Sequence, residues 1–281
     1  MKQYKADLHT HTIASDGALT AEQLVSKAAD AGVDIISITD HDSIESLEPA
    51  RLKGEQVGVE VIPGVELSLN IEERDVHLLA YFFDPANSDF RNYLLSVREA
   101  RFRRAERIVS ALHKLNVNLP FEAVLSKAGS GTIGRFHIAL ALLELGYVST
   151  YQNAFTKYLG FRAPAYEKNI SLPPEELFSL VTGAGGLTFI AHPGKSFSDS
   201  VLQTLIKLGV DGIEVIHPSH SPALTNYYRS IASEYCLLES GGSDYHGGER
   251  QDDYAFGTVT IPITFVETMR HRLFQTTTIL D

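Results

Sequence analysis

The stretch 34-DIISITDH-41 decides the fold class, because a short apolar run is followed within two residues by Asp40, His41 and Asp42, whose side chains can bind metal or protons. Similar runs recur along the chain at 4–9, 59–69, 75–83, 187–192, 212–217 and 237–246. Runs of this kind are typical of buried parallel strands. Between the first two runs, Thr20 and Gln23 have the spacing of a capping box and predict a helix over about 19–32. Alternating strands and helices predict an α/β protein, either a βα barrel or a doubly wound sheet.

Residues 86 to 168 interrupt this alternation. They contain no convincing strand and read as several helices in succession, the first over about 88–115 and another over 133–146. We therefore expect 86–168 to be an inserted helical subdomain, with 1–85 and 169–281 forming the α/β unit. No linker of low complexity separates them, so we expect both parts to share one packed unit.

The composition is that of a globular protein. The chain has 281 residues, of which 44% are hydrophobic and 21% charged. No apolar run approaches the roughly 18 residues of a membrane span, and Asp7, His9 and His11 stand where a signal peptide needs an apolar stretch. We therefore expect a cytoplasmic protein with no membrane partner. The single cysteine, Cys236, excludes an intrachain disulfide and a multi-cysteine zinc site.

The charge of the chain is acidic. A formal net charge of −11 disfavours a surface that coats long nucleic acids and, at first sight, any anionic substrate. Eleven histidines are the more informative feature of the composition.

Potential metal ligands lie at or just after the ends of nearly every predicted strand. In a barrel the carboxyl ends of parallel strands meet on one face, so these residues should converge. A single His-x-His is weak evidence, but burying the whole set without metal would be costly. Imidazole and carboxylate ligands suit Zn²⁺, Mn²⁺ or Fe²⁺. The residues are His9, His11, His41, Glu66, His77, His192, Asp244 and His246, with Asp40 and Asp42 beside His41.

The motifs that contain these residues resemble those of the PHP (polymerase and histidinol phosphatase) family of metal-dependent phosphoesterases. The matching motifs, in chain order, are 7-DLHTHT-12 with Ser15-Asp16-Gly17, 39-TDHD-42, 63-PGVE-66, 191-AHP-193 and 242-GSDYHG-247. The resemblance implies a distorted, TIM-like (β/α)7 barrel with a helical insertion and a trinuclear metal centre.

Further strings are similar to one branch of that family, which contains 3',5'-nucleotide bisphosphate phosphatases and the 5'-to-3' exoribonucleases called RNase AM. They are 134-GRFHIALAL-142, 158-YLGFRAPAY-166 and 212-GIEVIHPSHS-221. The chain departs from the branch at Phe136, where proline is usual, and at Phe161-Arg162, where Arg-Gly is more typical. Both departures affect the shape of the nucleoside pocket.

The resemblance also implies which residues hold each metal. One metal would be bound by His9, His11, Glu66 and Asp244, and a second by Glu66, as a bridge, with His77 and His192. A third would be bound by Asp16, His41 and His246. Asp16 indicates the nucleotide phosphatase branch, because other branches have histidine there. Asp40 and Asp42 are expected to orient a ligand histidine rather than to bind metal.

A centre of this kind needs no protein nucleophile. Two cations roughly 3.5–4 Å apart can share a hydroxide and clamp the phosphoryl oxygens during in-line attack. The leaving group needs a proton or a third cation, and His217 or His220, both of which we expect to contact the substrate, could help there. His217 is the better candidate because it closes a predicted strand. A helix-capping or solvent-facing role is the alternative for His217 and the more favoured role for His220.

Phosphate recognition needs cations that are not metal-bound. Arg135 follows Gly134 at a predicted helix start and is our candidate for both substrate binding and catalysis. Five arginines between 98 and 107 cover more than one helical face, and Glu99 and Glu106 could balance them in solvent. Arg101 and Arg104, three apart on one face, are the predicted substrate-binding pair.

The leading hypothesis is a phosphatase that removes the 3'-phosphate of nucleoside 3',5'-bisphosphates by attack of metal-activated hydroxide. The alternative is a 5'-to-3' exoribonuclease on short 5'-phosphorylated RNA, for which the arginine helix could line the path of the backbone. A non-catalytic PHP-like module is the least favoured hypothesis, because every expected ligand position is filled. Bound divalent cations would make the site electropositive although the chain is acidic.

Overall fold

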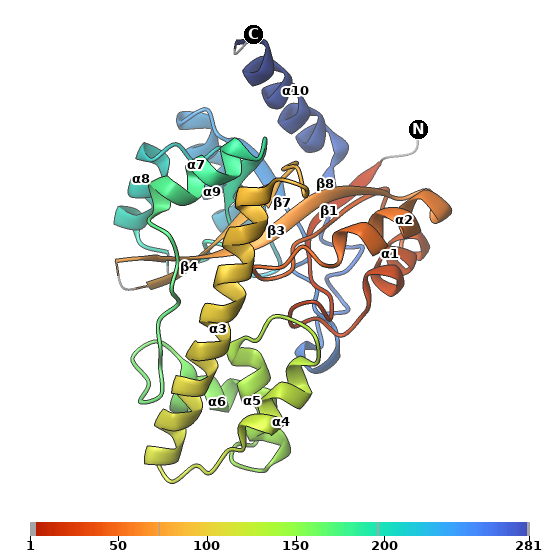
Figure 1. Ribbon diagram of the computed structural model, residues 1–281. Helices are drawn as coiled ribbons and strands as arrows, with labels where there is room; N and C mark the ends of the chain where they lie inside the picture. Colours follow the sequence, from red (N-terminus) through yellow and green to blue (C-terminus); the bar gives the residue numbers. More distant parts are fainter. Residues whose placement is uncertain (1–3, 73, 196, 280–281) are drawn as a thin grey trace.

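The computed structural model describes residues 4–72, 74–195 and 197–279 (Figure 1). One sheet of eight strands has the order β7-β6-β5-β4-β3-β2-β1-β8. Its strands are β1 (Lys5–Thr10), β2 (Ile35–Ile38), β3 (Glu60–Ile71), β4 (Arg74–Tyr81), β5 (Leu187–Ile190), β6 (Gly212–Ile216), β7 (Leu238–Gly241) and β8 (Ile261–Pro262). The predicted α/β barrel is thereby confirmed, and the structure adds the short strand β8.

Helices follow the strands along the chain and cover the outside of the sheet (Figure 1). Those of the barrel are α1 (Ala21–Asp30), α2 (Leu47–Val57), α7 (Pro174–Gly183), α8 (Asp199–Lys207), α9 (Pro222–Glu234) and α10 (Ile263–Ile279). The predicted capping box at the start of α1 is confirmed. The Thr20 side chain accepts from the Gln23 N–H, and the Gln23 side chain accepts from the Thr20 N–H.

The prediction that all the strands are parallel is wrong for β4. This strand pairs antiparallel with both of its neighbours, β3 and β5. The β3–β4 ladder extends to the pair Ile71–Arg74, so only two residues connect the two strands. A parallel connection needs a crossover of about a dozen residues, and the five residues between the predicted runs 59–69 and 75–83 are too few.

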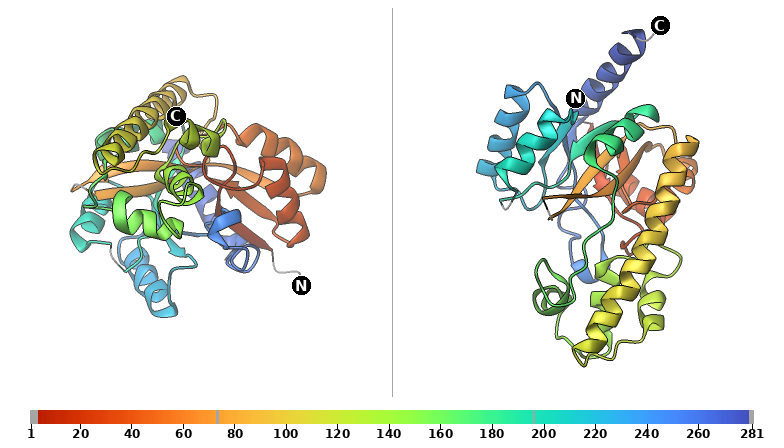
Figure 2. Two further views of the ribbon diagram at one scale, coloured as in Figure 1. Left: turned by 90° about the horizontal axis from the view of Figure 1, so that it is seen from below. Right: turned by 60° about the vertical axis from the view of Figure 1, so that its left-hand side comes forward.

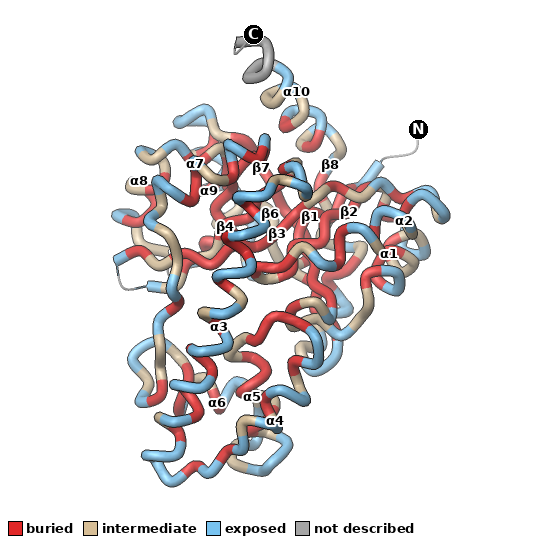
Figure 3. The backbone as a smooth tube through the Cα atoms, in the orientation of Figure 1, coloured by how far each residue is buried: buried red, intermediate tan, exposed pale blue. Residues whose placement is uncertain are grey.

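The two ends of the sheet approach each other and nearly close the barrel. The backbone N–H of His11, just after β1, donates to the carbonyl of Tyr245, just after β7, at 2.8 Å. Glycine is needed at this seam, because a Cβ on Gly242 would lie 2.5 Å from the backbone nitrogen of His9. The barrel interior is red in Figure 3, which marks buried residues. The seam brings the residues that follow β7 beside those that follow β1.

The helices that lie between β4 and α7 in the chain form the lower lobe of Figure 1, and the right-hand view of Figure 2 shows α3 running from the barrel into it. They are α3 (Ser88–Lys114), α4 (Phe121–Ala128), α5 (Arg135–Glu144), α6 (Tyr151–Ala154) and the π-helix η1 (Phe155–Leu159). Ile108, Leu112, Leu142 and Leu159 belong to a core cluster of this lobe that is distinct from those of the barrel. The boundaries at residues 86 and 168 stay a prediction.

The last helix, α10, extends from the barrel toward the C-terminus at the top of Figure 1. Its first turns pack on the sheet through Val266 and Met269, which are fully buried. Among the helices in the described part of the chain, none combines the length and apolar character that crossing a membrane requires.

Candidate metal centre

The predicted metal ligands converge on one end of the barrel. They come from six strands or from the loops after them, although they span more than 230 positions of sequence. The imidazole rings lie against one another. The ring centroids are 5.2 Å apart for His9 and His11, 3.9 Å for His11 and His246, and 4.9 Å for His41 and His77. The structure therefore brings together the whole predicted ligand set.

Glu66, in β3, lies at the centre of the cluster and is completely buried. Its two carboxylate oxygens face different histidines. Oε1 is 2.8 Å from both His77 Nδ1 and His192 Nε2. Oε2 is 3.4 Å from His9 Nε2, 3.3 Å from His11 Nε2 and 3.1 Å from His41 Nδ1. This is the arrangement that a carboxylate bridging two cations requires.

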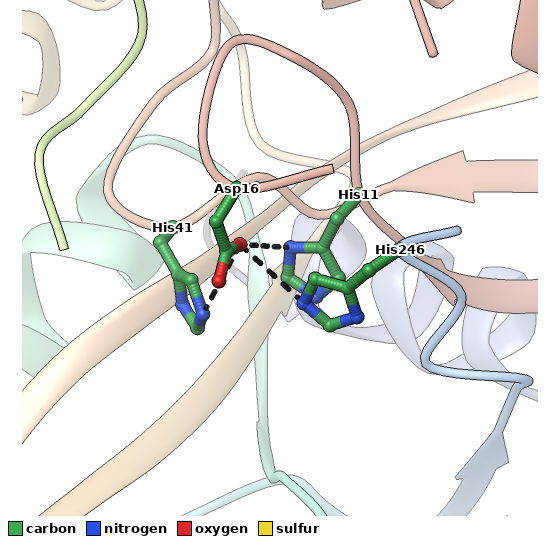
Figure 4. A group of neighbouring side chains, drawn as sticks. All are labelled: His11, Asp16, His41 and His246. Carbon is green, nitrogen blue, oxygen red and sulfur yellow. Dashed lines mark ion pairs between the residues drawn. The ribbon is translucent and has the colours of Figure 1, made fainter. Parts of the chain in front are cut away.

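Two aspartates complete the cluster on either side. Asp244 Oδ1 is 3.2 Å from the Nε2 atoms of both His9 and His11, so these three residues and Glu66 enclose one position. Asp16 lies between the rings of His41 and His246 (Figure 4). Its Oδ1 is 3.4 Å from His246 Nε2 and 3.8 Å from His41 Nε2. Asp16, His41 and His246 also form one group with His11 whose ligand atoms lie within 4.8 Å of one another.

Buried polar atoms without hydrogen bonds show that this cluster fits metal ions. Buried nitrogen and oxygen atoms normally have a hydrogen-bond partner, and each exception calls for an explanation such as an ion. Within the described residues, seven such atoms belong to the cluster and point at one another: His9 Nε2, His11 Nε2, Asp16 Oδ1, His41 Nδ1, Glu66 Oε2, His77 Nδ1 and His246 Nε2. Imidazole nitrogens and carboxylate oxygens in this number suit divalent transition metals.

The buried carboxylates of the cluster are ionised, which favours the binding of cations. Burial alone would raise the pKa of Glu66, but the charges of His41, His77 and His9 hold it well below its usual range. Burial lowers the pKa of His11, yet the adjacent carboxylates of Asp244 and Glu66 outweigh it and raise that pKa to about 9. Burial lowers the pKa of His41 and that of His246, so without metal the protons that balance the buried carboxylates are held by other histidines, such as His9 and His11, whose pKa values are raised. Metal binding must displace those protons, since only a neutral imidazole is a ligand.

The backbone is strained at the loops that present these side chains. Asp42, His192 and Asp244 have φ angles of 49°, 25° and 49°, in the left-handed region that residues other than glycine rarely adopt. Each of these residues directly follows a strand or lies within a few residues of its end. Strain of this kind is concentrated at functional sites, where the surrounding structure holds it in place.

Asp40 and Asp42 do not orient ligand histidines, contrary to our expectation. Asp40 accepts from the backbone of Thr12 and from the hydroxyls of Thr12, Ser15 and Ser46, at 2.6–2.7 Å. It therefore holds the loop between His11 and Asp16 in shape. Asp42 accepts from the Ser68 N–H at 2.9 Å and from Arg101 at 2.7 Å. Both carboxylates are used by neighbours other than histidine.

Glu214, in the middle of β6, has the orienting role instead, and the sequence analysis missed it. Its Oε1 is 2.9 Å from His9 Nδ1, and its Oε2 accepts from the backbone N–H of His192 at 2.6 Å. Glu214 is completely buried. An acidic residue between Ile213 and Val215 in a buried strand was the signal that could have identified it.

His217 and His220 have different surroundings. His217 lines the pocket over the cluster, with Nε2 3.2 Å from Asp244 Oδ2 and Nδ1 2.7 Å from Ser219 Oγ. His220 accepts from the Gly194 N–H through Nε2 at 3.2 Å, and its Nδ1 is 3.1 Å from the carbonyl of Val215. Both ring nitrogens of His220 are thus bonded to backbone, which favours a structural role over the predicted contact with substrate.

The three predicted phosphate-binding arginines all line this pocket. Arg101 is held by Asp42 and by Ser68 Oγ, at 2.7 and 2.8 Å. Arg104 and Arg135 each lie 3.2 Å from Asp75 Oδ2. Burial and the neighbouring charge of Arg135 lower the pKa of Arg104 to about 9, so its guanidinium is still charged at neutral pH.

Other arginines of α3 have the solvated role that we weighed against substrate binding. Arg103 is exposed and lies 3.4 Å from Glu99. Arg98 pairs with Glu45, and Arg107 lies 3.1 Å from Glu167. The face of α3 that carries Arg101 and Arg104 is therefore the one turned toward the site.

Sequence reasoning missed two further charged residues. Arg250 is paired with Asp16 Oδ2, lies 4.4 Å from the centroid of the Phe136 ring, and lines the pocket. Asp75 anchors both Arg104 and Arg135. Neither lies in a motif that resembles the family, so only the three-dimensional structure assigns them to the site.

The pocket over the cluster has a volume of about 380 Å³. Histidines and carboxylates form its floor, and Arg101, Arg104, Arg135 and Arg250 lie around its walls. Fixed guanidinium groups are suited to phosphate oxygens. With metal ions on its floor, the pocket can bind and polarise a phosphate ester.

Comparison with known proteins agrees with this chemistry. A model of the PHP domain matches residues 7–159. A 5'-3' exoribonuclease of Haemophilus influenzae is 32% identical over 247 residues, which cover 86% of this chain and 90% of that protein. A 3',5'-nucleoside bisphosphate phosphatase of Chromobacterium violaceum is 31% identical over 246 residues, which cover 85% and 86%.

A solved structure from Bifidobacterium adolescentis, described as a candidate metal-dependent phosphoesterase, superposes with a TM-score of 0.85. It is 32% identical, and the match covers 95% of this chain and 96% of that one. Relatives named by their activity act on phosphate esters, which disfavours a non-catalytic module. From the domain match, these relatives and the shared fold, it follows that the chain belongs to the PHP domain family of metal-dependent phosphoesterases.

Proposed function

We propose that this phosphoesterase hydrolyses phosphate monoesters of small nucleotides, and that its main reaction removes the 3'-phosphate of nucleoside 3',5'-bisphosphates. The observation that carries the proposal is the position of Arg101, Arg104 and Arg135, which line the same pocket as the ligand cluster. A substrate with two phosphates could place one on the metal ions and the other on these arginines. The bisphosphate phosphatase of Chromobacterium violaceum supports this substrate class.

Three divalent cations, Mn²⁺, Zn²⁺ or Fe²⁺, would be held by the residues of the cluster. His9, His11, Glu66 and Asp244 would hold one; Glu66, His77 and His192 a second; and Asp16, His41 and His246 a third. When bound, the cations activate the attacking water and neutralise the phosphoryl oxygens.

Other side chains of the protein would bind the substrate and supply the proton to the leaving group. Arg135, at the start of α5, would bind the phosphate that is not attacked and thereby align the substrate for the reaction, while Asp75 keeps the guanidinium of Arg135 in place. His217 would give a proton through Nε2 to the leaving oxygen. Its Nδ1 is fixed by Ser219, so that the ring presents Nε2 to the pocket.

A comparison of two substrates tests the proposal. Purified enzyme with Mn²⁺ is offered adenosine 3',5'-bisphosphate and a 5'-phosphorylated trinucleotide, and kcat/KM is measured for each. We expect faster turnover of the bisphosphate. Faster cleavage of the trinucleotide would instead establish the runner-up, a 5'-to-3' exoribonuclease on short RNA, which the relative from Haemophilus influenzae supports.

Replacing Arg135 with alanine should mainly weaken substrate binding. The variant loses a charged hydrogen-bond donor to phosphate, and we expect KM to rise at least about tenfold with a smaller change in kcat. Steady-state kinetics with the bisphosphate measure both constants. Arg103→Ala is the matched control, because Arg103 is exposed and pairs with Glu99 away from the pocket. An unchanged KM in Arg135→Ala would remove Arg135 from the proposed substrate contacts.

A further inference from the structure

Arg250 differs from the other arginines that line the pocket over the ligand cluster. Those three are paired with Asp42 or Asp75, and neither of these carboxylates is a proposed metal ligand. Arg250 is paired with Asp16, which is a proposed ligand of the third cation. Within the described part of the chain, it is therefore the pocket arginine that shares its carboxylate with a metal position.

The two oxygens of Asp16 have separate partners. Oδ2 accepts from Arg250, whereas Oδ1 lies 3.4 Å from His246 Nε2 and 3.8 Å from His41 Nε2 (Figure 4). Oδ1 is buried and has no hydrogen-bond partner, so it is the atom that remains for a cation. The Asp16 side chain is only 6% exposed, and salt screens a pair at this depth much less than a surface pair.

The guanidinium of Arg250 is also held from a second direction. Its carbon Cζ lies 4.4 Å from the centroid of the Phe136 ring, whose face attracts a cation. Phe136 is buried and meets the Tyr151 ring nearly edge to face, with centroids 5.2 Å apart. An ion pair on an open surface can separate when a metal ion arrives, but a guanidinium between a carboxylate and a fixed ring keeps its place.

Another carboxylate near this position, Asp252, does not offset the charge of Arg250. Its oxygens accept from the backbone N–H groups of His246 and Gly247, each at 2.8 Å. Asp252 Oδ2 lies 3.8 Å from His246 Nδ1, whereas the atom of His246 that would bind metal is Nε2. The charge of Asp252 therefore stabilises the loop that carries Arg250, behind the His246 ring.

The proposed metal positions consequently differ in charge. Glu66 and Asp244 serve the first and second positions, and both are paired with histidines. Protons on those histidines leave when metal binds, so two negative charges remain for the cations. At the third position the charges of Asp16 and Arg250 cancel, −1 + 1 = 0, and an arginine does not lose its proton. A divalent cation there meets ligands with no net negative charge.

We propose that Arg250 makes the third metal position dependent on a phosphate group, so that this position fills when the phosphate of the substrate lies over the cluster. This inference rests on the proposed function, which supplies both the third position and the phosphate. A phosphate monoester carries about −1.5 to −2 charges at pH 7 and so replaces the charge of Asp16 that Arg250 cancels. Arg250 thereby links completion of the metal centre to the arrival of substrate.

Metal content measured with and without phosphate tests this role of Arg250. Metal-free protein is dialysed to equilibrium against Mn²⁺, with or without inorganic phosphate, and bound Mn²⁺ is measured by elemental analysis. We expect two equivalents per chain without phosphate and three with it. Asp16→Asn should bind two equivalents in both conditions, which assigns the third one to the Asp16 position.

Two substitutions of Arg250 separate its charge from its bulk. Arg250→Met removes the charge and should bind the third equivalent without phosphate, with a Kd at least about tenfold lower than that of wild type. Arg250→Lys keeps the charge and should retain the dependence on phosphate. Arg103→Met is the matched control, because Arg103 is exposed and pairs with Glu99 outside the pocket.

The outcomes separate this inference from the proposed function. Three equivalents in wild type without phosphate would overturn the inference, and so would an Arg250→Met protein that still needs phosphate or that loses the third equivalent altogether. Two equivalents in wild type under both conditions would overturn the third metal position as well. A phosphate-dependent third equivalent in an enzyme that does not hydrolyse adenosine 3',5'-bisphosphate would overturn the proposed substrate and support the role of Arg250.

Discussion

Glu66→Gln should lose at least about 100-fold in kcat, the largest effect that we expect from a single substitution. The two oxygens of Glu66 face five histidines, with Oε1 toward His77 and His192 and Oε2 toward the others. An amide keeps the shape of the side chain but has one neutral oxygen and an NH₂ group that repels cations. The bridge between two metal positions is therefore lost, whichever way the amide is turned.

Metal content and turnover are measured together in this experiment. The Glu66→Gln protein should contain fewer equivalents of Mn²⁺ than wild type after dialysis, and added Mn²⁺ should not restore kcat. Glu239→Gln is the matched control, because Glu239 is an acidic residue of β7 that pairs with Arg229 on the outside of the barrel. More than about a tenth of wild-type turnover in Glu66→Gln would contradict a mechanism with a bridging carboxylate.

Much of this architecture is visible in the sequence because strand ends are local features. A buried strand such as Ile35–Ile38 is identified by its own apolar run. The polar residues that follow the run must then lie at the carboxyl end of that strand. The convergence of His9, His41 and Asp244 then follows from a general property of barrels rather than from any pairwise contact. For this reason the ligand cluster could be predicted before its geometry was known.

Roles that depend on a partner distant in sequence could not be predicted in the same way. Asp40 and Asp42 flank His41, which suggested that they orient a histidine, but the loop geometry turns them toward Thr12 and Arg101. Glu214 is 205 positions from His9, and nothing near either residue specifies their contact. The wrong prediction that β4 is parallel has a different cause. The connection before β4 is too short for a parallel crossover, and this length could be read from the sequence.

Glu214→Gln should lower the affinity for Mn²⁺ by about 10- to 100-fold. Glu214 accepts from the backbone N–H of His192 and faces Nδ1 of His9. Burial would raise the pKa of Glu214, but the charges of His9 and its neighbours lower it, so the group is a carboxylate. An anionic acceptor keeps the proton of His9 on Nδ1 and leaves Nε2 free for metal. An amide can instead donate to Nδ1, which moves the proton to Nε2 and blocks the ligand atom.

The contrast with Glu66→Gln makes this prediction specific. Glu214 touches no proposed metal position, so excess Mn²⁺ should restore most of the kcat of Glu214→Gln by mass action. Titration of turnover with Mn²⁺ measures the shift, and Glu239→Gln again serves as the control because it changes a carboxylate elsewhere in the same sheet. Two results would contradict a positioning role for Glu214: an unchanged Mn²⁺ dependence, or a loss of kcat that persists at saturating Mn²⁺. The first would mean that the tautomer of His9 is set by other contacts, and the second that Glu214 takes part in the reaction itself.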